Sequence, residues 1–250
     1  MNIETMRSQF EEERSKWPQY LRPWTAVLPG LVYMPEGGFA SGIGCMDEGV
    51  VKMSTSDRRP PMIRLAGAGI MLGSSPAISR NMTAQLVKDR QLTCISYHRD
   101  CGAGAAVAST GEDGDAIIKK FATSVAAKAG VEAVCAPLNR IPHYHKVVAH
   151  YYCGVPFAPH AADLPAGFVT SRFAVTPEYG KHELRLAIEI AFGEHGFGEL
   201  FTLAEKYVVA VVASSRGERD VYVAEVEEVV ASLTQRVRER VGIGTFVRAS

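Results

Sequence analysis

This chain of 250 residues lacks both long apolar runs and an excess of charge of one sign. No segment approaches the roughly 20 consecutive apolar residues that a helix needs to cross a bilayer. The 27 Lys and Arg residues equal the 27 Asp and Glu residues in number, so no basic excess points to nucleic acid. We therefore expect no membrane partner and no nucleic-acid partner.

Cysteine is scarce and odd in number, which argues against a disulfide framework in a chain of this length. A secretory signal peptide is also not expected, because residues 1–16 are rich in Glu and Arg. Both observations predict a cytoplasmic protein with reduced thiols. Some of these thiols would bind a metal, and the others would pack as small apolar side chains. The five cysteines are Cys45, Cys94, Cys101, Cys135 and Cys153.

Apolar segments alternate with helical patterns along the chain. Hydrophobic residues make up 47% of the sequence, which is ample for a buried core. The alternation predicts an α/β fold with a central, mostly parallel β-sheet flanked by helices. Strands or apolar segments are expected at 39–46, 62–72, 92–97, 147–155 and 207–213, helices at 3–16, 78–90, 115–129, 182–192 and 221–241, and a loop at 156–177.

Three candidate metal ligands follow two of the expected strands. His98 directly follows the apolar run 92–97, Cys101 comes three residues later, and Cys45 lies one residue before the end of the segment 39–46. Sites in parallel α/β sheets form at the carboxyl ends of strands, so we expect these side chains to meet. Zinc favours thiolates and imidazoles, and three such ligands leave a fourth position for water. Asp47 is placed to reach either the metal or its bound water.

The same residues resemble the motifs of a known enzyme family. The segment Cys45-Met46-Asp47-Glu48-Gly49 resembles the C-x-D-x-R motif of β-class carbonic anhydrases. His98-Arg99-Asp100-Cys101-Gly102-Ala103-Gly104 resembles the H-x-D-C-G segment of that family. Between them, Ile63-Arg64-Leu65-Ala66-Gly67 is similar to its R-N-A-G strand. The resemblance covers roughly residues 36–130, with a weaker echo in the segment 147–155.

The resemblance implies a zinc-dependent, carbonic anhydrase-like lyase that interconverts carbon dioxide and bicarbonate through zinc-bound hydroxide. It makes Cys45, His98 and Cys101 the ligands of a Zn2+ ion. It makes Asp47 the catalytic residue, which accepts a hydrogen bond from the hydroxide and orients it. Members of the family are built from dimers, so a homodimer or a higher even homo-oligomer is expected, with a small molecule as substrate.

The motif departs from the family pattern at two positions. Gly49 stands where the family has an arginine that pairs with the aspartate and holds it away from zinc, and Leu65 stands where asparagine is usual. We expect Asp47 to bind the metal, because Gly49 offers it no partner. Alternatively, another arginine supplies the guanidinium: Arg58, Arg59 or Arg64. Two other functions stay open, a zinc hydrolase of carbonyl sulfide or carbon disulfide and a non-catalytic zinc protein closed by Asp47.

The sequence shows no internal repeat and no low-complexity linker, so we expect a single α/β domain over residues 1–250. Residues 1–35 would form an N-terminal helical arm that packs on the body or on a neighbouring subunit. Residues 36–180 would form the zinc-binding core, and residues 181–250 a C-terminal helix–strand–helix extension.

Two further patterns do not favour a second site. The glycine-rich segment 67–73 follows a strand, but its third glycine comes one residue late for a dinucleotide-binding loop and no acidic residue ends the next strand. His143 and His145 fit a loop. His150 and Cys153 lie three apart on an expected strand, so their side chains point to opposite faces and should not bind one ion together.

Overall fold

The structure is a computed structural model that describes most of the chain from residue 37 onward. The described residues are 8, 11–12, 37–47, 49–50, 52–54, 56, 58–138, 149–159, 164–165, 167–193 and 196–247. Contacts divide the chain into two compact units, which we call the first unit (residues 34–142) and the second unit (residues 1–33 and 143–250). Apart from residues 8, 11 and 12, the expected N-terminal helix and arm lie outside the described residues.

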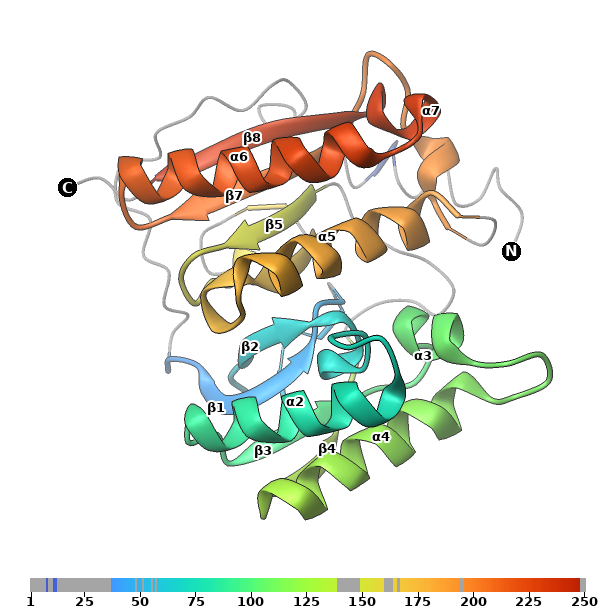
Figure 1. The fold of residues 1–250 in the computed structure, drawn as a ribbon, viewed down its shortest axis with the longest axis vertical. Helices are drawn as coiled ribbons and strands as arrows, with labels where there is room; N and C mark the ends of the chain where they lie inside the picture. The colour runs from blue at the N-terminus through green and yellow to red at the C-terminus, as the bar shows by residue number, and fades with distance from the viewer. Residues whose placement is uncertain are drawn as a thin grey trace. The chain divides into compact units, whose positions relative to one another are not determined.

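The first unit is built on a four-stranded parallel sheet with the order β2-β1-β3-β4 (Figure 1). Strands β1 and β3 are therefore central. Their neighbouring residues Ile43, Ile63 and Ile95 are completely buried. Each such side chain contributes about 1.5–3 kcal/mol by leaving water. The strands are β1 (Ala40–Cys45), β2 (Pro61–Leu65), β3 (Cys94–Tyr97) and β4 (Glu132–Cys135).

The first unit also contains two long helices, α2 (Pro76–Asp89) and α4 (Gly114–Ala129). Helix α2 begins at Ser75, whose side chain accepts a hydrogen bond from the backbone N–H of Ile78 and so caps the helix. Helix α4 ends at Gly130, which has the left-handed φ of 76° that favours glycine at this position. The helix predicted over residues 115–129 is confirmed.

Strand register brings the predicted ligands to one edge of the sheet. Gly42 lies opposite Cys94 and Ile43 opposite Ile95, so the carboxyl ends of β1 and β3 lie side by side. A side chain at Gly44 would place its Cβ 2.7 Å from the Ser96 Oγ atom, so only glycine allows this close packing. Cys45 and the residue after β3 therefore emerge together.

The second unit is built on another four-stranded parallel sheet, with the order β6-β5-β7-β8 (Figure 1). All seven residues of β7 are buried, which is typical of a parallel strand covered on both faces. The strands are β5 (Ala149–Cys153), β6 (Gly167–Ser171), β7 (Tyr207–Ala213) and β8 (Val241–Val247), and the helices are α5 (Pro177–Ala191), α6 (Arg216–Ser232) and α7 (Gln235–Arg238).

Two strands of the second unit contradict the sequence prediction. Strand β6 lies in the segment 156–177, which the sequence predicts to be a loop. The helix expected at 221–241 ends at Ser232, and Val241 already begins β8. Valine suits both helical faces and buried strands, so its spacing did not mark the change from helix to strand.

The two units share one topology. In each sheet the first strand along the chain lies between the second and third, and the fourth strand lies outside the third. A helix follows the second strand of each unit (α2 and α5), and another precedes the fourth (α4 and α6). The structure thus contains a repeat that the sequence does not show. Because β5, β6, β7 and β8 form one sheet, the boundary between the two compact units falls between residues 142 and 143.

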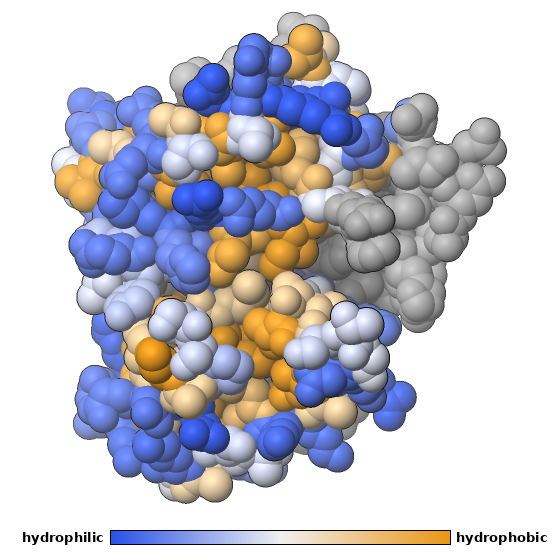
Figure 2. Space-filling view, turned by 45° about the vertical axis from the view of Figure 1, so that its right-hand side comes forward, coloured by the Kyte–Doolittle hydropathy of each residue, from blue (hydrophilic) through white to orange (hydrophobic). Residues whose placement is uncertain are grey.

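The α/β fold class predicted from the sequence is confirmed in both units. On the face shown in Figure 2, hydrophilic residues cover much of the described surface and apolar residues appear between them. Among the described residues, no helix is long and apolar enough to span a membrane. The large apolar side chains that the described part exposes are Ile78, Tyr179, Leu203 and Val221.

Candidate metal centre

The structure brings together the three residues predicted to bind a metal. The ligand atoms of Cys45, His98 and Cys101 all lie within 4.8 Å of one another, and all three residues are buried. The two Sγ atoms are 3.9 Å apart. A tetrahedral ion about 2.3 Å from each sulfur would set them about 3.8 Å apart. The cluster could therefore hold a metal ion without rearrangement of its thiols.

Local structure sets the position of each ligand. Cys45 is the last residue of β1, His98 directly follows β3, and Cys101 directly precedes the short helix α3 (Gly102–Val107). Between the two ligands of this turn, Asp100 takes a left-handed conformation with φ of 54°. Its backbone N–H donates a hydrogen bond of 2.8 Å to the Asp115 carboxylate, which fixes the turn to the first residues of α4.

The imidazole of His98 has the arrangement typical of a metal ligand. Its Nδ1 atom lies 2.7 Å from the carbonyl oxygen of Arg99, which can only accept a hydrogen bond, so Nδ1 carries the proton. Its Nε2 atom is buried and has no hydrogen-bond partner among the described residues. A buried polar atom without a partner costs about 1–3 kcal/mol. A metal ion bound at Nε2 would satisfy it, while the carbonyl orients the ring.

The three ligands strongly perturb one another's protonation. A hydrogen bond from Cys101 holds the pKa of Cys45 well below its usual range, although burial opposes this. The same hydrogen bond, together with burial, raises the pKa of Cys101 well above its usual range. Burial lowers the pKa of His98, but the Cys45 thiolate outweighs it and the result is a pKa of about 9. Near neutral pH the cluster therefore combines a thiolate, a thiol and an imidazolium, and a bound metal must displace protons.

Asp47 is buried beside the cluster but is not part of the ligand set. Its Oδ1 atom accepts a hydrogen bond of 2.8 Å from the backbone N–H of Gly49. The expectation that Gly49 offers Asp47 no partner is therefore wrong, because the backbone N–H of Gly49 provides one. The catalytic role of Asp47 stays a prediction.

Of the three arginines considered as substitutes for the motif arginine, Arg64 reaches the turn after β1. Its Nε atom donates a hydrogen bond of 3.3 Å to the carbonyl oxygen of Cys45, and its Nη2 atom donates one to the carbonyl oxygen of Asp47. The residue is 3% exposed. Arg58 and Arg59 are exposed.

An open depression of about 320 Å³ adjoins the cluster through Cys101. Three carboxylates line it, and a concentration of like charge in a concave surface attracts ions of opposite sign. The depression therefore offers cations an approach to the metal ligands. Its lining residues are Asp100, Cys101, Gly102, Ala105, Asp113, Gly114 and Asp115.

The other histidines and cysteines considered in the sequence do not add a second cluster among the described residues. His150 is buried in the second unit, 2.8 Å from the Thr170 hydroxyl and 3.3 Å from the Tyr207 hydroxyl. Burial lowers its pKa to about 3, so the ring is neutral at neutral pH. His143 and His145 lie outside the described residues.

At the carboxyl ends of its strands, the second unit has a counterpart to one of the three metal ligands. Cys153 is the last residue of β5 and pairs with the last residue of β6, just as Cys45 ends β1 and pairs with the last residue of β2. After β7, however, Ser214 stands where His98 follows β3. Sequence comparison of the two halves could have matched the cysteines, but the remaining ligands have no counterpart to reveal the repeat.

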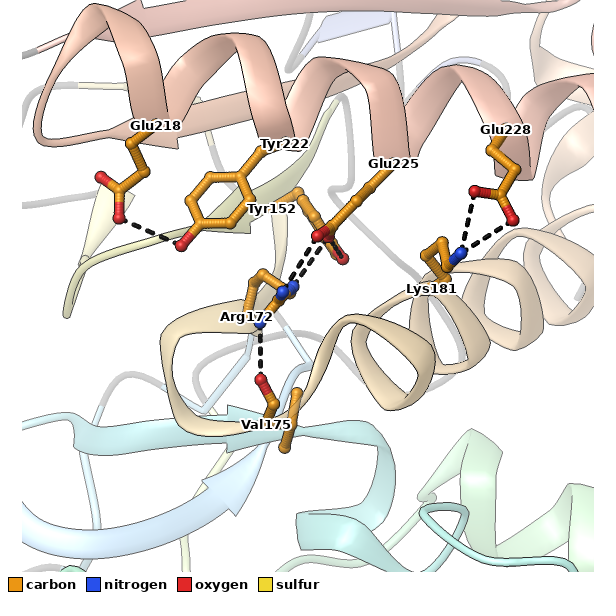
Figure 3. Close-up of polar contacts among 8 residues, drawn as sticks. All are labelled: Tyr152, Arg172, Val175, Lys181, Glu218, Tyr222, Glu225 and Glu228. Carbon is orange, nitrogen blue, oxygen red and sulfur yellow. Dashed lines mark hydrogen bonds and ion pairs between the residues drawn. The ribbon is translucent and has the colours of Figure 1, made fainter.

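A buried ion pair occupies this part of the second unit (Figure 3). The Arg172 guanidinium donates to both carboxylate oxygens of Glu225, at 2.7 and 2.9 Å, and the Tyr152 hydroxyl donates to the same carboxylate at 2.7 Å. Arg172 also donates to the carbonyl oxygen of Val175 and lies 5.3 Å from the centre of the Tyr222 ring. These contacts join the end of β6 to α6. Sequence patterns did not indicate this network, because its members lie up to 73 residues apart.

No protein-family model, no curated protein and no solved structure matches this chain. The likeness to β-class carbonic anhydrases therefore rests on the motif residues of the first unit alone. What the structure adds is that the three motif ligands meet in one buried cluster.

Proposed function

We propose that this protein binds zinc through Cys45, His98 and Cys101 and interconverts carbon dioxide and bicarbonate. The observation that carries the proposal is the buried cluster itself, whose ligand atoms lie within 4.8 Å of one another. The hydrogen bond from His98 Nδ1 to the Arg99 carbonyl leaves Nε2 as the ligand atom. Two thiolates and one imidazole favour zinc over hard cations such as magnesium, which prefer oxygen ligands.

Zinc, when bound, would lower the pKa of a coordinated water to about 7 and so supply hydroxide near neutral pH. Cys45 and Cys101 would hold the ion with two thiolates, whose negative charges offset its own and weaken this acidification. His98 would contribute a neutral imidazole, oriented by the Arg99 carbonyl. Groups around the ligands therefore matter more here than in a site made of histidines alone.

Asp47 is the residue that we propose orients the reacting water. It is buried two residues beyond Cys45, and the Gly49 N–H fixes one of its carboxylate oxygens. A carboxylate in this place can accept a hydrogen bond from the water and direct a lone pair toward the carbon of carbon dioxide. Formation of the new carbon–oxygen bond then gives bicarbonate, and the proton passes to solvent.

Metal analysis of the purified protein tests the binding half of the proposal. We expect about one zinc ion per chain, as three protein ligands in one cluster imply. Cys45→Ser and Cys101→Ser should lose most of the metal. Cys153→Ser is the matched control, because this cysteine is equally buried but lies in the core of the second unit. Zinc that is absent from the wild type, or lost equally from the control, would contradict the proposed ligands.

Stopped-flow hydration of carbon dioxide, followed with a pH indicator, tests the catalytic half. We expect zinc-dependent hydration that Asp47→Asn reduces while the metal stays bound. A zinc-loaded wild type with no rate above buffer at any pH would reject carbon dioxide as the substrate. Assays with carbonyl sulfide and carbon disulfide would then separate a related hydrolase from a non-catalytic zinc protein.

We also propose that the chain assembles as a homodimer or a higher even homo-oligomer. The support for this is the dimeric build of the family whose motifs it resembles. Light scattering coupled to size-exclusion chromatography gives the mass of the assembly directly. A monomer at micromolar concentration would contradict the proposal.

A further inference from the structure

Arg64 is a buried guanidinium at the edge of the sheet where the metal ligands meet. It lies in β2 directly opposite Gly44 of β1, one residue before the Cys45 ligand. A buried guanidinium needs hydrogen-bond acceptors, because its transfer from water is otherwise very costly. Acceptors for Arg64 are provided by the turn that carries the ligand and the carboxylate.

Two hydrogen bonds of Arg64 span this turn. Nε donates to the carbonyl oxygen of Cys45 and Nη2 to the carbonyl oxygen of Asp47. Both donors belong to one planar, rigid group, so the distance and direction between the two carbonyls are fixed together. Charge-assisted hydrogen bonds of this kind are also roughly twice as strong as neutral ones. The main chain that links the ligand to the carboxylate therefore has little freedom.

The Asp47 carboxylate is constrained from its other side by Gly49. Its Oδ1 atom accepts the hydrogen bond from the Gly49 N–H, and its oxygens lie outside the group of ligand atoms. For Asp47 to enter the ligand set, this hydrogen bond would have to break and the turn held by Arg64 would have to move.

We propose that Arg64 is a positioning residue that takes over the task of the arginine missing at position 49. It acts through the main chain of Cys45 and Asp47 rather than by binding the reacting molecules. It keeps Cys45 directed at the metal and keeps the Asp47 carboxylate beside the fourth coordination position instead of in it. The inference rests on the proposed metal site and gives the proposed reaction its open position for water.

Cobalt(II) substitution tests this inference with a readout that needs no catalysis. The visible spectrum of cobalt reports its ligands, and added azide changes the spectrum where a coordinated water can be exchanged. We expect azide to change the spectrum of the wild type. In Arg64→Gln the freed Asp47 carboxylate should occupy the fourth position, and the azide response should be lost. Arg58→Gln is the matched control, since this arginine is exposed, and it should behave as the wild type.

The double variant Arg64→Gln/Asp47→Asn separates positioning from a purely structural role. If Arg64 acts by keeping Asp47 off the metal, removal of the carboxylate should restore the azide response. An unchanged loss of response would show that Arg64 only supports the fold and would overturn the proposal. Arg64→Lys should give a partial response, because a single ammonium group cannot hold both carbonyls in the geometry of the fork.

Asp47→Asn alone tests the inference even if the Arg64 variants fail to fold. We expect its cobalt spectrum to keep the wild-type ligand pattern, since Asp47 is not a ligand while Arg64 is present. A spectrum that shows the loss of an oxygen ligand would overturn the proposal. A wild type that binds cobalt but does not hydrate carbon dioxide would reject the proposed reaction and leave this result standing. A wild type that binds no cobalt would overturn both.

Discussion

Metal binding should become about 100-fold tighter for each unit of pH gained between about pH 6 and about pH 8. In this range the cluster holds one proton on Cys101, whose pKa is raised well above its usual range, and one on His98, whose pKa is raised to about 9. Cys45 is already a thiolate, because its pKa is lowered. Both protons must leave when the metal binds.

The size of the effect follows from this proton count. Each displaced proton changes the dissociation constant tenfold per pH unit, so two protons give about 100-fold, or about 2.8 kcal/mol. The sign follows from the raised pKa values, since protons compete with the metal below these values and the competition weakens as the pH rises. Near pH 9 the slope should fall to about one proton, because His98 then loses its proton without the metal.

Competition with a chromophoric chelator at several pH values measures this slope, and two variants make the test specific. Cys45→Ser should bind more weakly and should also show a slope of only about one proton. The reason is that the thiolate which raises the pKa of His98 is gone, and burial then keeps the imidazole neutral. Cys153→Ser should keep the wild-type slope. Equal slopes for the wild type and Cys45→Ser, or a wild-type slope of three protons, would refute the assigned protonation.

Three further predictions concern the support of the site and the fold. Glu225→Ala should destabilise the protein by about 3–5 kcal/mol in urea unfolding, because it leaves the buried Arg172 guanidinium uncompensated, whereas Glu225→Leu combined with Arg172→Met should cost clearly less. Asp115→Ala should weaken metal binding about 10–100-fold, because it removes the carboxylate that anchors the turn at Asp100; unchanged affinity in the chelator assay would contradict this. Gly130→Ala should cost about 1–2 kcal/mol from its left-handed backbone alone, since no atom lies within 4 Å of the new methyl group; a larger loss would indicate a clash.

The site was more predictable than the architecture around it. Cys45 and His98 each lie at the end of an apolar strand, and the rule that parallel strands bring their carboxyl ends together was enough to unite them. The hydrogen bond from Gly49 to Asp47 could not be predicted from the motif, because the donor is a backbone N–H and not the side chain of residue 49. The contribution of Arg64 depends on the register of β2 against β1, which motif spacing does not specify.

The second sheet shows where the sequence signal failed. Strand β6 has five residues between two prolines, and β8 follows a helix rich in the same β-branched residues. Because the sequence does not predict these two strands, it cannot predict the repeated strand order either. Residues 147–155 were therefore grouped with the metal-binding core. The retained cysteine pair, Cys45 and Cys153, was too small a signal to show the repeat by itself.

The repeated topology bears on what the metal does for the protein. The second unit forms the same strand order as the first with an ion pair between Arg172 and Glu225, and without a His and Cys cluster among its described residues. The same strand order therefore forms where the described residues hold an ion pair in place of the metal ligands. The fold of the first unit would then not depend on its metal. Metal ligands at the carboxyl ends of the strands could be gained or lost in evolution while the fold is kept.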